Sequence, residues 1–374
     1  MQLTSESDMR TFIFILLSFF AGIGMKAQVK AEVSETVELM SILSRTAGFG
    51  EYCMDMGGKY TKDTETWFAP YKQHAIIPYY QDLRAKYGIS YDAVMSMALH
   101  LAIDKGKLVM LADKAHLEKR WKNVDVDAFL VLLNQFYTDT RFQEFYQQHL
   151  AFYDEVIKIY EANVMPHFNQ DWYRRFYGCE PTEQFRVIIG FTNGGGSYGP
   201  SRELPGHPKE SFAICGYWIN EQSGKAFEDG TGMASTLIHE FNHSFVNPLL
   251  KSETNAALME SIGKELQELS YIGMKNQAYG NWQTVVNESI VRAAVIIYMQ
   301  EHGFDEKQLL NEMYNQVSRD FRWMPELVVC LRNYTNHQDQ YKTFSDYYPE
   351  IAKCLGNYIN EEKERMRSSL HPEL

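Results

Sequence analysis

The sequence is poor in positive charge and in cysteine. Lys and Arg number 36 against 48 Asp and Glu, which gives a formal net charge of -12. Because nucleic acids are polyanions, this balance argues against nucleic acid as a partner. The chain has five cysteines, and no two of them have the CxxC spacing of a zinc ribbon. We expect most of the five to be buried as small apolar side chains.

Long apolar runs are absent except near the N-terminus. Residues 11–20 form an uncharged apolar segment that follows Arg10, and small residues follow it up to Ala27. A basic start, a short apolar middle and a small residue at the end form the layout of a secretory signal. We place the cleavage after Ala27, and Met9 gives a better signal start than Met1 because Arg10 follows it directly.

A membrane anchor is the alternative interpretation of this segment. The apolar run is shorter than the ~20 residues that a membrane-spanning helix requires, so a signal peptide over residues 1–27 is favoured. No later segment is apolar enough to cross a bilayer. We therefore expect a secreted or periplasmic protein with no transmembrane span in the mature chain.

The composition is that of a folded protein, with 45% apolar and 14% aromatic residues. Residues from about 32 to 175 carry apolar side chains at helical spacing, as at 129–136. Two segments rich in β-branched and aromatic residues, 185–191 and 212–219, predict strands. Between them lies a Gly-rich loop, 193–200, which lacks the GK[ST] ending of a phosphate-binding loop and is expected to be a flexible turn.

From Gly232 onward the pattern is helical again. Pro248 is expected to end one helix, and further helices are expected at 254–269 and 282–302. We expect an α+β fold, mainly helical, with a small mixed sheet. The chain is divided into a helical N-terminal region at 28–180, a core at 181–303 and a C-terminal helical region at 304–374.

The motif with the clearest chemical meaning is His239-Glu240-Phe241-Asn242-His243. Residues four apart on a helix lie on the same face, about 6 Å apart along the axis, so two imidazoles can converge on one zinc ion. The Glu after the first His can reach a water on the metal. An accidental match is the alternative.

The surroundings of the motif favour metal binding over chance. At 100° per residue, an apolar stripe formed by Met233, Leu237, Phe241 and Phe245 lies opposite the two His residues. The stripe can pack on a core while both imidazoles face a cleft. A structural pair of buried His residues would be expected on the stripe itself.

A catalytic zinc site needs a third protein ligand and an open fourth position. The metzincin extension is excluded, because Val246 and Leu249 stand where that class has Gly and His. The remaining route is a Glu on a later helix. We choose Glu288, since a carboxylate in so apolar a helix needs a reason to be there, and Arg292 is one turn further on. The other candidates are Glu260, which is second in order, Glu265 and Glu268.

The HExxH motif, the later helix with Glu288 and the strands before the motif resemble the gluzincin branch of zinc metallopeptidases. More narrowly, residues 239–248 and 287–293 resemble an uncharacterised family of secreted bacterial proteins with a gluzincin-like domain. The resemblance spans most of the mature chain, and the zinc motif is its specific part. It implies a zincin-like core, a peptide or protein substrate, and a strand at 212–219 or a segment near Tyr198 that pairs with an extended substrate.

The resemblance also implies roles for individual residues. His239, His243 and Glu288 would hold Zn²⁺, and Glu240 would take a proton from a bound water and pass it to the leaving amine. Gluzincins often add a Tyr or His that donates to the oxyanion. Candidates for that role are Tyr271, Tyr279, Tyr298 and His207.

Two other functions stay open on the sequence alone. One is a zinc hydrolase that acts on another amide substrate, and the other is a non-catalytic extracellular binding protein on a zincin scaffold. The presence of Glu240 argues against the second, because a binding protein has no chemical need for it. The sequence does not set the oligomeric state.

Overall fold

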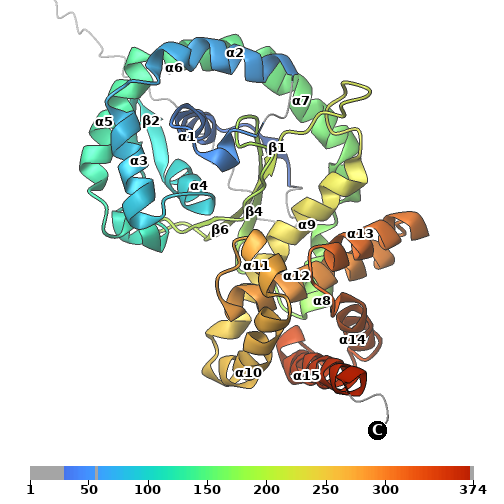
Figure 1. Ribbon diagram of the computed structural model, residues 1–374. Helices are drawn as coiled ribbons and strands as arrows, with labels where there is room; N and C mark the ends of the chain where they lie inside the picture. The colour runs from blue at the N-terminus through green and yellow to red at the C-terminus, as the bar shows by residue number, and fades with distance from the viewer. Residues whose placement is uncertain (1–28, 55–57, 371–374) are drawn as a thin grey trace, which may run out of the picture.

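The structure is a computed structural model in which residues 29–54 and 58–370 are described (Figure 1). It is mainly helical with a small mixed sheet, as the sequence predicts. The expected signal peptide, residues 1–27, lies outside the described residues. Among the described residues, no helix combines the length and the apolar character needed to cross a bilayer.

Most of the elements are helices, and the strands lie near the start and in the middle of the chain. The helices are α1 (Glu35–Thr46), α2 (Gly58–Phe68), α3 (Ile76–Tyr87), α4 (Asp92–Leu99), α5 (Val126–Asp139), α6 (Phe142–Gln148), α7 (Leu150–Asn163), α8 (Gln170–Tyr177), α9 (Gly230–Val246), α10 (Glu253–Leu269), α11 (Tyr271–Asn276), α12 (Trp282–Glu301), α13 (Glu306–Ser318), α14 (Met324–Asn336) and α15 (Phe344–Leu370). The strands are β1 (Ala31–Glu32), β2 (Leu101–Asp104), β3 (Lys107–Met110), β4 (Gln184–Gly190), β5 (Ser201–Arg202) and β6 (Glu210–Gly216).

The main sheet has the order β1-β4-β6-β5. Strands β1, β4 and β6 are parallel, and β5 runs antiparallel to β6 at the edge. The predicted strand at 185–191 is confirmed as β4 within one residue at each end. The predicted strand at 212–219 is wrong at its C-terminal end, because β6 stops at Gly216 and Trp218 beyond it is 43% exposed.

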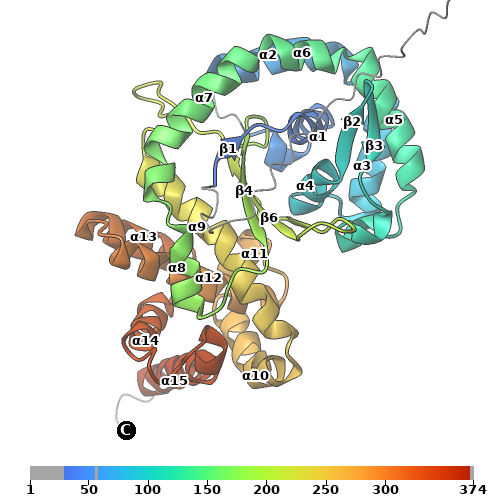
Figure 2. The ribbon, with the colours of Figure 1, turned by 180° about the vertical axis from the view of Figure 1, so that it is seen from behind.

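Helices α2, α3, α5, α6 and α7 form an arc around α1 and the sheet (Figures 1 and 2). Helices α10 to α15 gather below it, and α9 lies at the junction of the two parts. The predicted helices at 254–269 and 282–302 are α10 and α12, each within one residue. Helix α9 ends at Val246, just before Pro248, as expected.

One hairpin interrupts the region from 32 to 175 that we expected to be helical. Strands β2 and β3 pair in register from Leu101↔Met110 to Asp104↔Lys107. The turn between them is Lys105-Gly106, and both residues have positive φ, 49° and 77°. This is the backbone of a two-residue hairpin turn. The Lys-Gly pair between two short apolar runs indicates such a hairpin, but the helical spacing of apolar residues in this region led to a prediction of helix.

Helix α9 packs its apolar stripe on the sheet and on α8. The ring of Phe241 is fully buried and stacks on Phe185 of β4 at 4.2 Å between centroids. Phe245 stacks on Tyr177 of α8 at 4.4 Å. The predicted orientation holds for Leu237, Phe241 and Phe245, whereas Met233 at the start of the stripe is half-buried and lines the same cleft as the two His residues.

The Gly-rich loop after β4 is tightly packed where we expected a flexible turn. Gly194 has φ 67°, and a Cβ added there would lie 2.0 Å from the carbonyl oxygen of Glu51.

The expectation that most of the cysteines are buried was also wrong. All five are free thiols, and only Cys215 and Cys330 are buried.

A buried carboxylate joins α1 to the start of this loop. Glu38 accepts hydrogen bonds from the Phe191 N–H at 2.7 Å, the Thr192 hydroxyl at 3.3 Å and the Tyr60 hydroxyl at 2.9 Å. Burial raises the pKa of Glu38 to about 7, although the three donors oppose it. The folded protein therefore binds a proton at Glu38 at a pH where the unfolded chain has already released it.

This raised pKa predicts a pH-dependent stability. Glu38 contributes stability that is fully present below pH 4.5 and is lost as the pH rises through about 7. The full effect is about 3 kcal/mol. Glu38→Gln keeps a carbonyl acceptor for Phe191 and stays neutral at every pH. We therefore expect its free energy of unfolding to fall less between pH 5 and pH 8 than that of the wild type. Denaturant unfolding of both proteins between pH 5 and pH 8 measures it, and parallel profiles would contradict the assignment.

Candidate metal centre

Three side chains from two helices meet on the exposed side of α9. The Nε2 atoms of His239 and His243 are 3.2 Å apart. On α12, Glu288 places Oε1 3.3 Å from Nε2 of His243 and Oε2 3.6 Å from Nε2 of His239. Among the residues described, this is the one group of three His, Cys, Asp or Glu side chains whose ligand atoms lie close enough to share an ion.

The spacing of these atoms suits one small divalent cation. Ligands at 2.0–2.1 Å from a tetrahedral ion are about 3.3 Å apart. The two imidazole nitrogens, 3.2 Å apart, and the pair of His243 Nε2 with Glu288 Oε1, 3.3 Å apart, match that figure, and His239 lies 3.6 Å from the other carboxylate oxygen, Oε2. Two imidazole nitrogens and one carboxylate oxygen are also the donor types that zinc takes. The residues therefore fit the metal that the motif predicts.

Local sequence places each ligand. Helix α9 starts at an Asp229 cap, whose side chain accepts from the Gly232 N–H, and no break follows before the two His residues. Helix α12 is capped by Asn281 and is buried along most of its length. Because α12 packs against α9, the carboxylate of Glu288 faces the imidazoles although the two segments are far apart in sequence.

Other side chains hold the three ligands in place. Arg292 donates to Oε2 of Glu288 from Nε at 3.0 Å, which leaves Oε1 turned toward His243. The guanidinium is itself held by Gln316 at 2.7 Å and Tyr279 at 2.9 Å. His243 Nδ1 lies 3.1 Å from Oδ1 of Asn247 and donates to it, which leaves Nε2 as the ring nitrogen that faces the centre.

The charges of the site are strongly coupled. Burial would raise the pKa of Glu288, but Arg292 and the two imidazoles outweigh it and hold that pKa well below 4.5. Burial lowers the pKa of His239 well below 6.5. Burial also disfavours charge on His243, yet its contacts with Glu288 raise the pKa to about 9. One proton thus sits between these groups, where a cation would replace it.

Glu240 lies beside the centre and is 9% exposed. Burial raises its pKa to about 7, a value that suits a group exchanging protons near neutral pH. The backbone of Gly199 passes directly over it. A Cβ at residue 199 would lie 2.6 Å from Oε2 of Glu240, so only glycine leaves that carboxylate in place.

The centre opens into a cleft of about 1030 Å³ between the two parts of the molecule. Tyr91, Gly199 and Trp218 line it from the side of the sheet. Tyr279 and Arg319 line it from the side of the C-terminal helices. The face of α9 that carries His239 and His243 is therefore open to molecules that enter this cleft.

The other glutamates considered from the sequence lie elsewhere. Glu260 is exposed and pairs with Lys264, and Glu265 pairs with Lys363. Glu268 is exposed on α10. Of the four candidates, only Glu288 reaches the imidazoles.

The structure also distinguishes the four residues that the sequence offered as donors to the oxyanion. Tyr279 lines the cleft, whereas Tyr271, Tyr298 and His207 do not. The hydroxyl of Tyr298 donates to the His167 carbonyl at 2.7 Å, which ties it to another part of the core. Tyr279 accepts a hydrogen bond from the Arg292 guanidinium, which also holds Glu288, and it lies next to Glu288 itself.

Several cleft residues escaped the sequence analysis. Gly199 lies in a loop whose glycines had no phosphate-binding pattern, and its role depends on how closely the loop passes α9. Trp218 was placed inside a strand. Arg319 follows an ordinary amphipathic helix and carries no motif. The Tyr-Gly-Pro sequence at 198–200, where a chain must bend beside a strand, was the one available signal.

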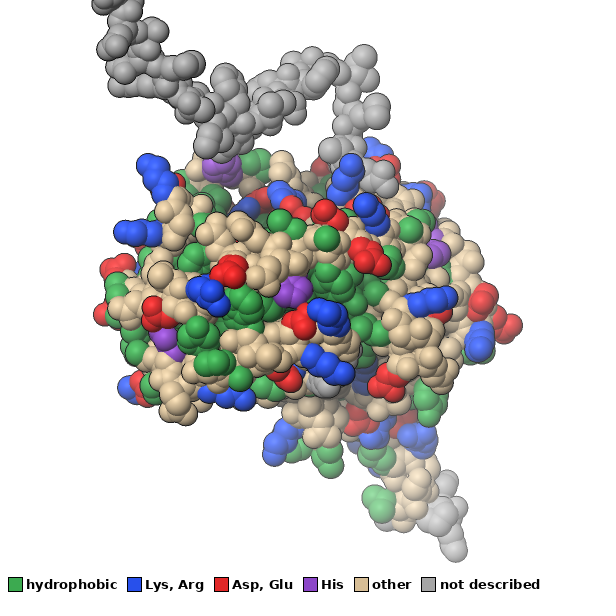
Figure 3. Space-filling view, turned by 90° about the horizontal axis from the view of Figure 1, so that it is seen from above, with side chains coloured by type: hydrophobic (Ala, Val, Ile, Leu, Met, Phe, Trp, Pro, Cys, Tyr) green, Lys and Arg blue, Asp and Glu red, His purple; other side chains and the backbone are tan. Residues whose placement is uncertain are grey.

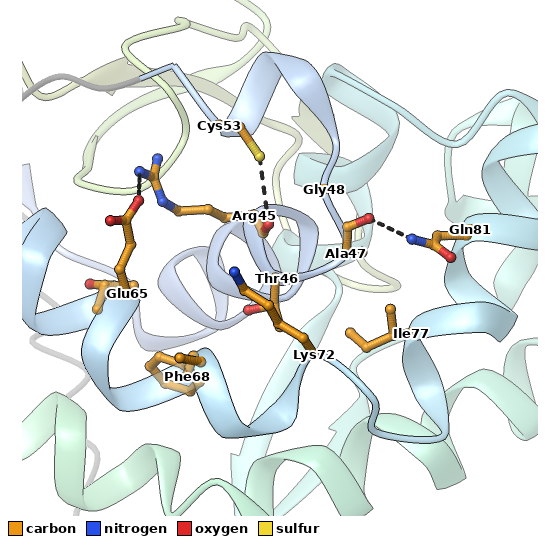
Figure 4. A pocket seen from close by; sticks show the side chains of 12 residues that line it. Arg45, Thr46, Ala47, Gly48, Cys53, Glu65, Phe68, Lys72, Ile77 and Gln81 are labelled. Atoms are coloured by element: carbon orange, nitrogen blue, oxygen red, sulfur yellow. Dashed lines mark hydrogen bonds and ion pairs between the residues drawn. The ribbon is translucent and has the colours of Figure 1, made fainter.

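A second cavity, of about 500 Å³, lies between α1, α2 and α3 (Figure 4). Its polar groups largely bind one another. Arg45 pairs with Glu65, and the Gln81 side chain donates to the Ala47 carbonyl at 2.8 Å. No group of metal ligands was found among the described residues that line it.

The outer surface shows no gathering of one charge on the face drawn in Figure 3, where acidic and basic side chains are interspersed.

Comparison with known proteins places the chain in a family. The family model described as a domain of unknown function, DUF4932, matches residues 28–354. The chain belongs to the DUF4932 family. No curated protein and no solved structure matches it.

The support of Glu288 by Arg292 predicts a large loss of stability when the guanidinium is removed. Arg292→Met leaves a buried carboxylate short of one positive partner, and we expect the free energy of unfolding to fall by about 3–5 kcal/mol. Chemical denaturation in the presence of a chelator measures this. Lys264→Met, which removes an exposed pair with Glu260, is the control and should cost less than about 1 kcal/mol.

Proposed function

We propose that this protein is a secreted or periplasmic zinc-dependent metallopeptidase of the gluzincin type. The observation that carries the proposal is the convergence of His239, His243 and Glu288 at ligand spacing, with Glu240 beside them in an open cleft. All three side chains line the cleft, and a catalytic zinc site requires an open position beside three protein ligands.

In this proposal the two imidazoles and the carboxylate of Glu288 would hold Zn²⁺. When bound, the ion supplies Lewis acidity, which lowers the pKa of a water and polarises a carbonyl. Glu240 takes the proton from the attacking water and delivers it to the departing amine nitrogen. Its pKa of about 7 allows both transfers near neutral pH, because neither protonation state is strongly disfavoured.

A peptide is the substrate that the walls of the cleft favour. Tyr198 pairs with Ile214 of β6 in both directions, at 3.0 and 2.9 Å, so residue 198 extends the edge of the sheet. The next residue, Gly199, is exposed and its peptide groups have no partner among the described residues. An extended peptide can pair with this backbone directly beside Glu240.

The order of elements also supports a zincin-like core. An edge strand, a central strand and then the HExxH helix follow one another along the chain, and α12 returns with the Glu ligand. The apolar segment at residues 11–20 motivates the secreted or periplasmic location. Release of the chain from cells with residue 28 at its N-terminus would support that part.

The first test is metal content. We expect the purified wild-type chain to hold one zinc per molecule, and Glu288→Ala to lower the zinc affinity by at least about 100-fold because an anionic ligand is lost. Competition with a chromogenic chelator gives the affinity. Glu260→Ala, on a neighbouring helix but away from the centre, is the matched control and should bind zinc like the wild type. Equal affinities for Glu288→Ala and wild type would refute the assigned ligand.

The second test separates binding from catalysis. Glu240→Gln should hold zinc normally yet cleave peptides about 10²–10⁴-fold more slowly, since the amide cannot accept the proton. Cleavage of a mixed peptide library, read by mass spectrometry, measures it. Zinc without cleavage in the wild type would point to another amide substrate or to a binding protein.

A further inference from the structure

The two walls of the cleft differ in character. On the side of the sheet, the rings of Tyr91 and Trp218 are exposed to 44% and 43%. On the opposite side, α11, the residues after it and α13 contribute amide side chains, the carboxylate of Glu312 and the guanidinium of Arg319. A substrate that crosses the metal centre therefore has an aromatic wall on one side and a polar wall that carries the guanidinium of Arg319 on the other.

Arg319 stands on a fixed piece of backbone. It caps α13, and its N–H is directed to the carbonyl oxygens of Asn315 and Gln316, both at 3.2 Å. Its own carbonyl accepts from the Gln277 side chain at 2.8 Å. The base of the side chain is thus held from two elements, while the side chain itself is exposed.

Of the three guanidinium groups that line the cleft, that of Arg319 alone has no ionic partner among the described residues. Asp92 and Arg120 pair at 2.5 Å, and Glu288 and Arg292 pair at 2.9 Å. Glu312 accepts from Gln316. Arg319 has no hydrogen bond or ion pair from its side chain to any described residue, although its charge is near enough to lower the pKa of His239.

We propose that Arg319 binds a carboxylate of the substrate, close to the bond that is cleaved. This inference rests on the metallopeptidase function proposed above. A guanidinium presents a planar fork of donors that fits a carboxylate with two parallel hydrogen bonds. In a peptide, the carboxylate is either the free C-terminus or the side chain of Asp or Glu.

The site therefore selects acidic peptides or peptide ends. The aromatic wall is neutral and Arg120 is already paired, so a carboxylate in the cleft has one open cationic partner besides the metal. A substrate that carries an amide in its place keeps the backbone pairing at Gly199 and loses only the contact with Arg319. This difference makes the inference measurable.

The experiment compares matched peptides on matched variants. A peptide cleaved by the zinc-loaded wild type is made with a free C-terminus or a C-terminal amide, and with Glu or Gln at each position around the cleaved bond. Arg319→Gln should lower kcat/KM for the carboxylate form by about tenfold to a hundredfold, mainly through KM. The neutral form should change by less than about twofold, and Arg319→Lys should fall between. If the effect of Arg319→Gln depends on the free C-terminus, the bound carboxylate is the end of the peptide. If it depends on Glu at one position, the bound carboxylate is that side chain.

Arg322→Gln is the control, because Arg322 is three residues away, pairs with Asp320 and does not line the cleft. It should leave both peptide forms unaffected. An equal fall of kcat for charged and neutral peptides in Arg319→Gln would overturn the inference, since it would mean that Arg319 acts on the reacting carbonyl of every substrate. No change for either form would overturn it too.

A binding measurement separates this inference from the proposed function. Calorimetry with Glu240→Gln, in which no turnover is needed, compares the same two peptides with and without Arg319→Gln. Preference for the carboxylate that disappears with Arg319 supports the inference. A wild type that holds no zinc and cleaves no peptide defeats the proposed function, whereas peptide binding without any carboxylate preference defeats only the role of Arg319.

Discussion

The ionic contact between α9 and α12 is the constraint on which the centre of this molecule depends. Glu288 is 8% exposed, and a carboxylate in such a place needs positive or hydrogen-bonding partners. It has them on both sides, in Arg292 along its own helix and in two imidazoles across the helix interface. The packing of the two helices and the charge balance of the site therefore constrain each other.

The rest of the fold positions the two faces of α9. Its apolar stripe packs on β4 and α8 through stacked aromatic rings, and this fixes the rotation of the helix about its axis. The opposite face must then look into the cleft. The loop that carries Gly199 is fixed in turn by the edge pairing at Tyr198 and by the hydrogen bonds of Glu38 at its start. The exposed backbone of Gly199 and the carboxylate of Glu240 thus lie side by side through contacts made far from either.

Prediction from the sequence succeeded where the signal is local. The helical period gave α10 and α12 within one residue, and β-branched and aromatic residues gave β4. It failed where a short element lies inside a longer pattern. The hairpin of β2 and β3 was hidden because four-residue strands hold too few residues to show alternation. The strand at 212–219 was drawn too long, because Tyr217 after Gly216 is buried in the core and Trp218 lines the cleft, and neither continues the sheet.

The sequence by itself determined that His239 and His243 share one face of a helix, that Glu240 flanks them and that an apolar stripe lies opposite. These are consequences of helical geometry, which spans only a few residues. The tertiary structure decided which of four glutamates meets the imidazoles, that Gly199 covers Glu240 and that Arg319 faces the same cleft. These contacts depend on how the helices pack against one another. Helix packing is set by residues far apart in the sequence, and a local sequence pattern does not reveal which of them will touch.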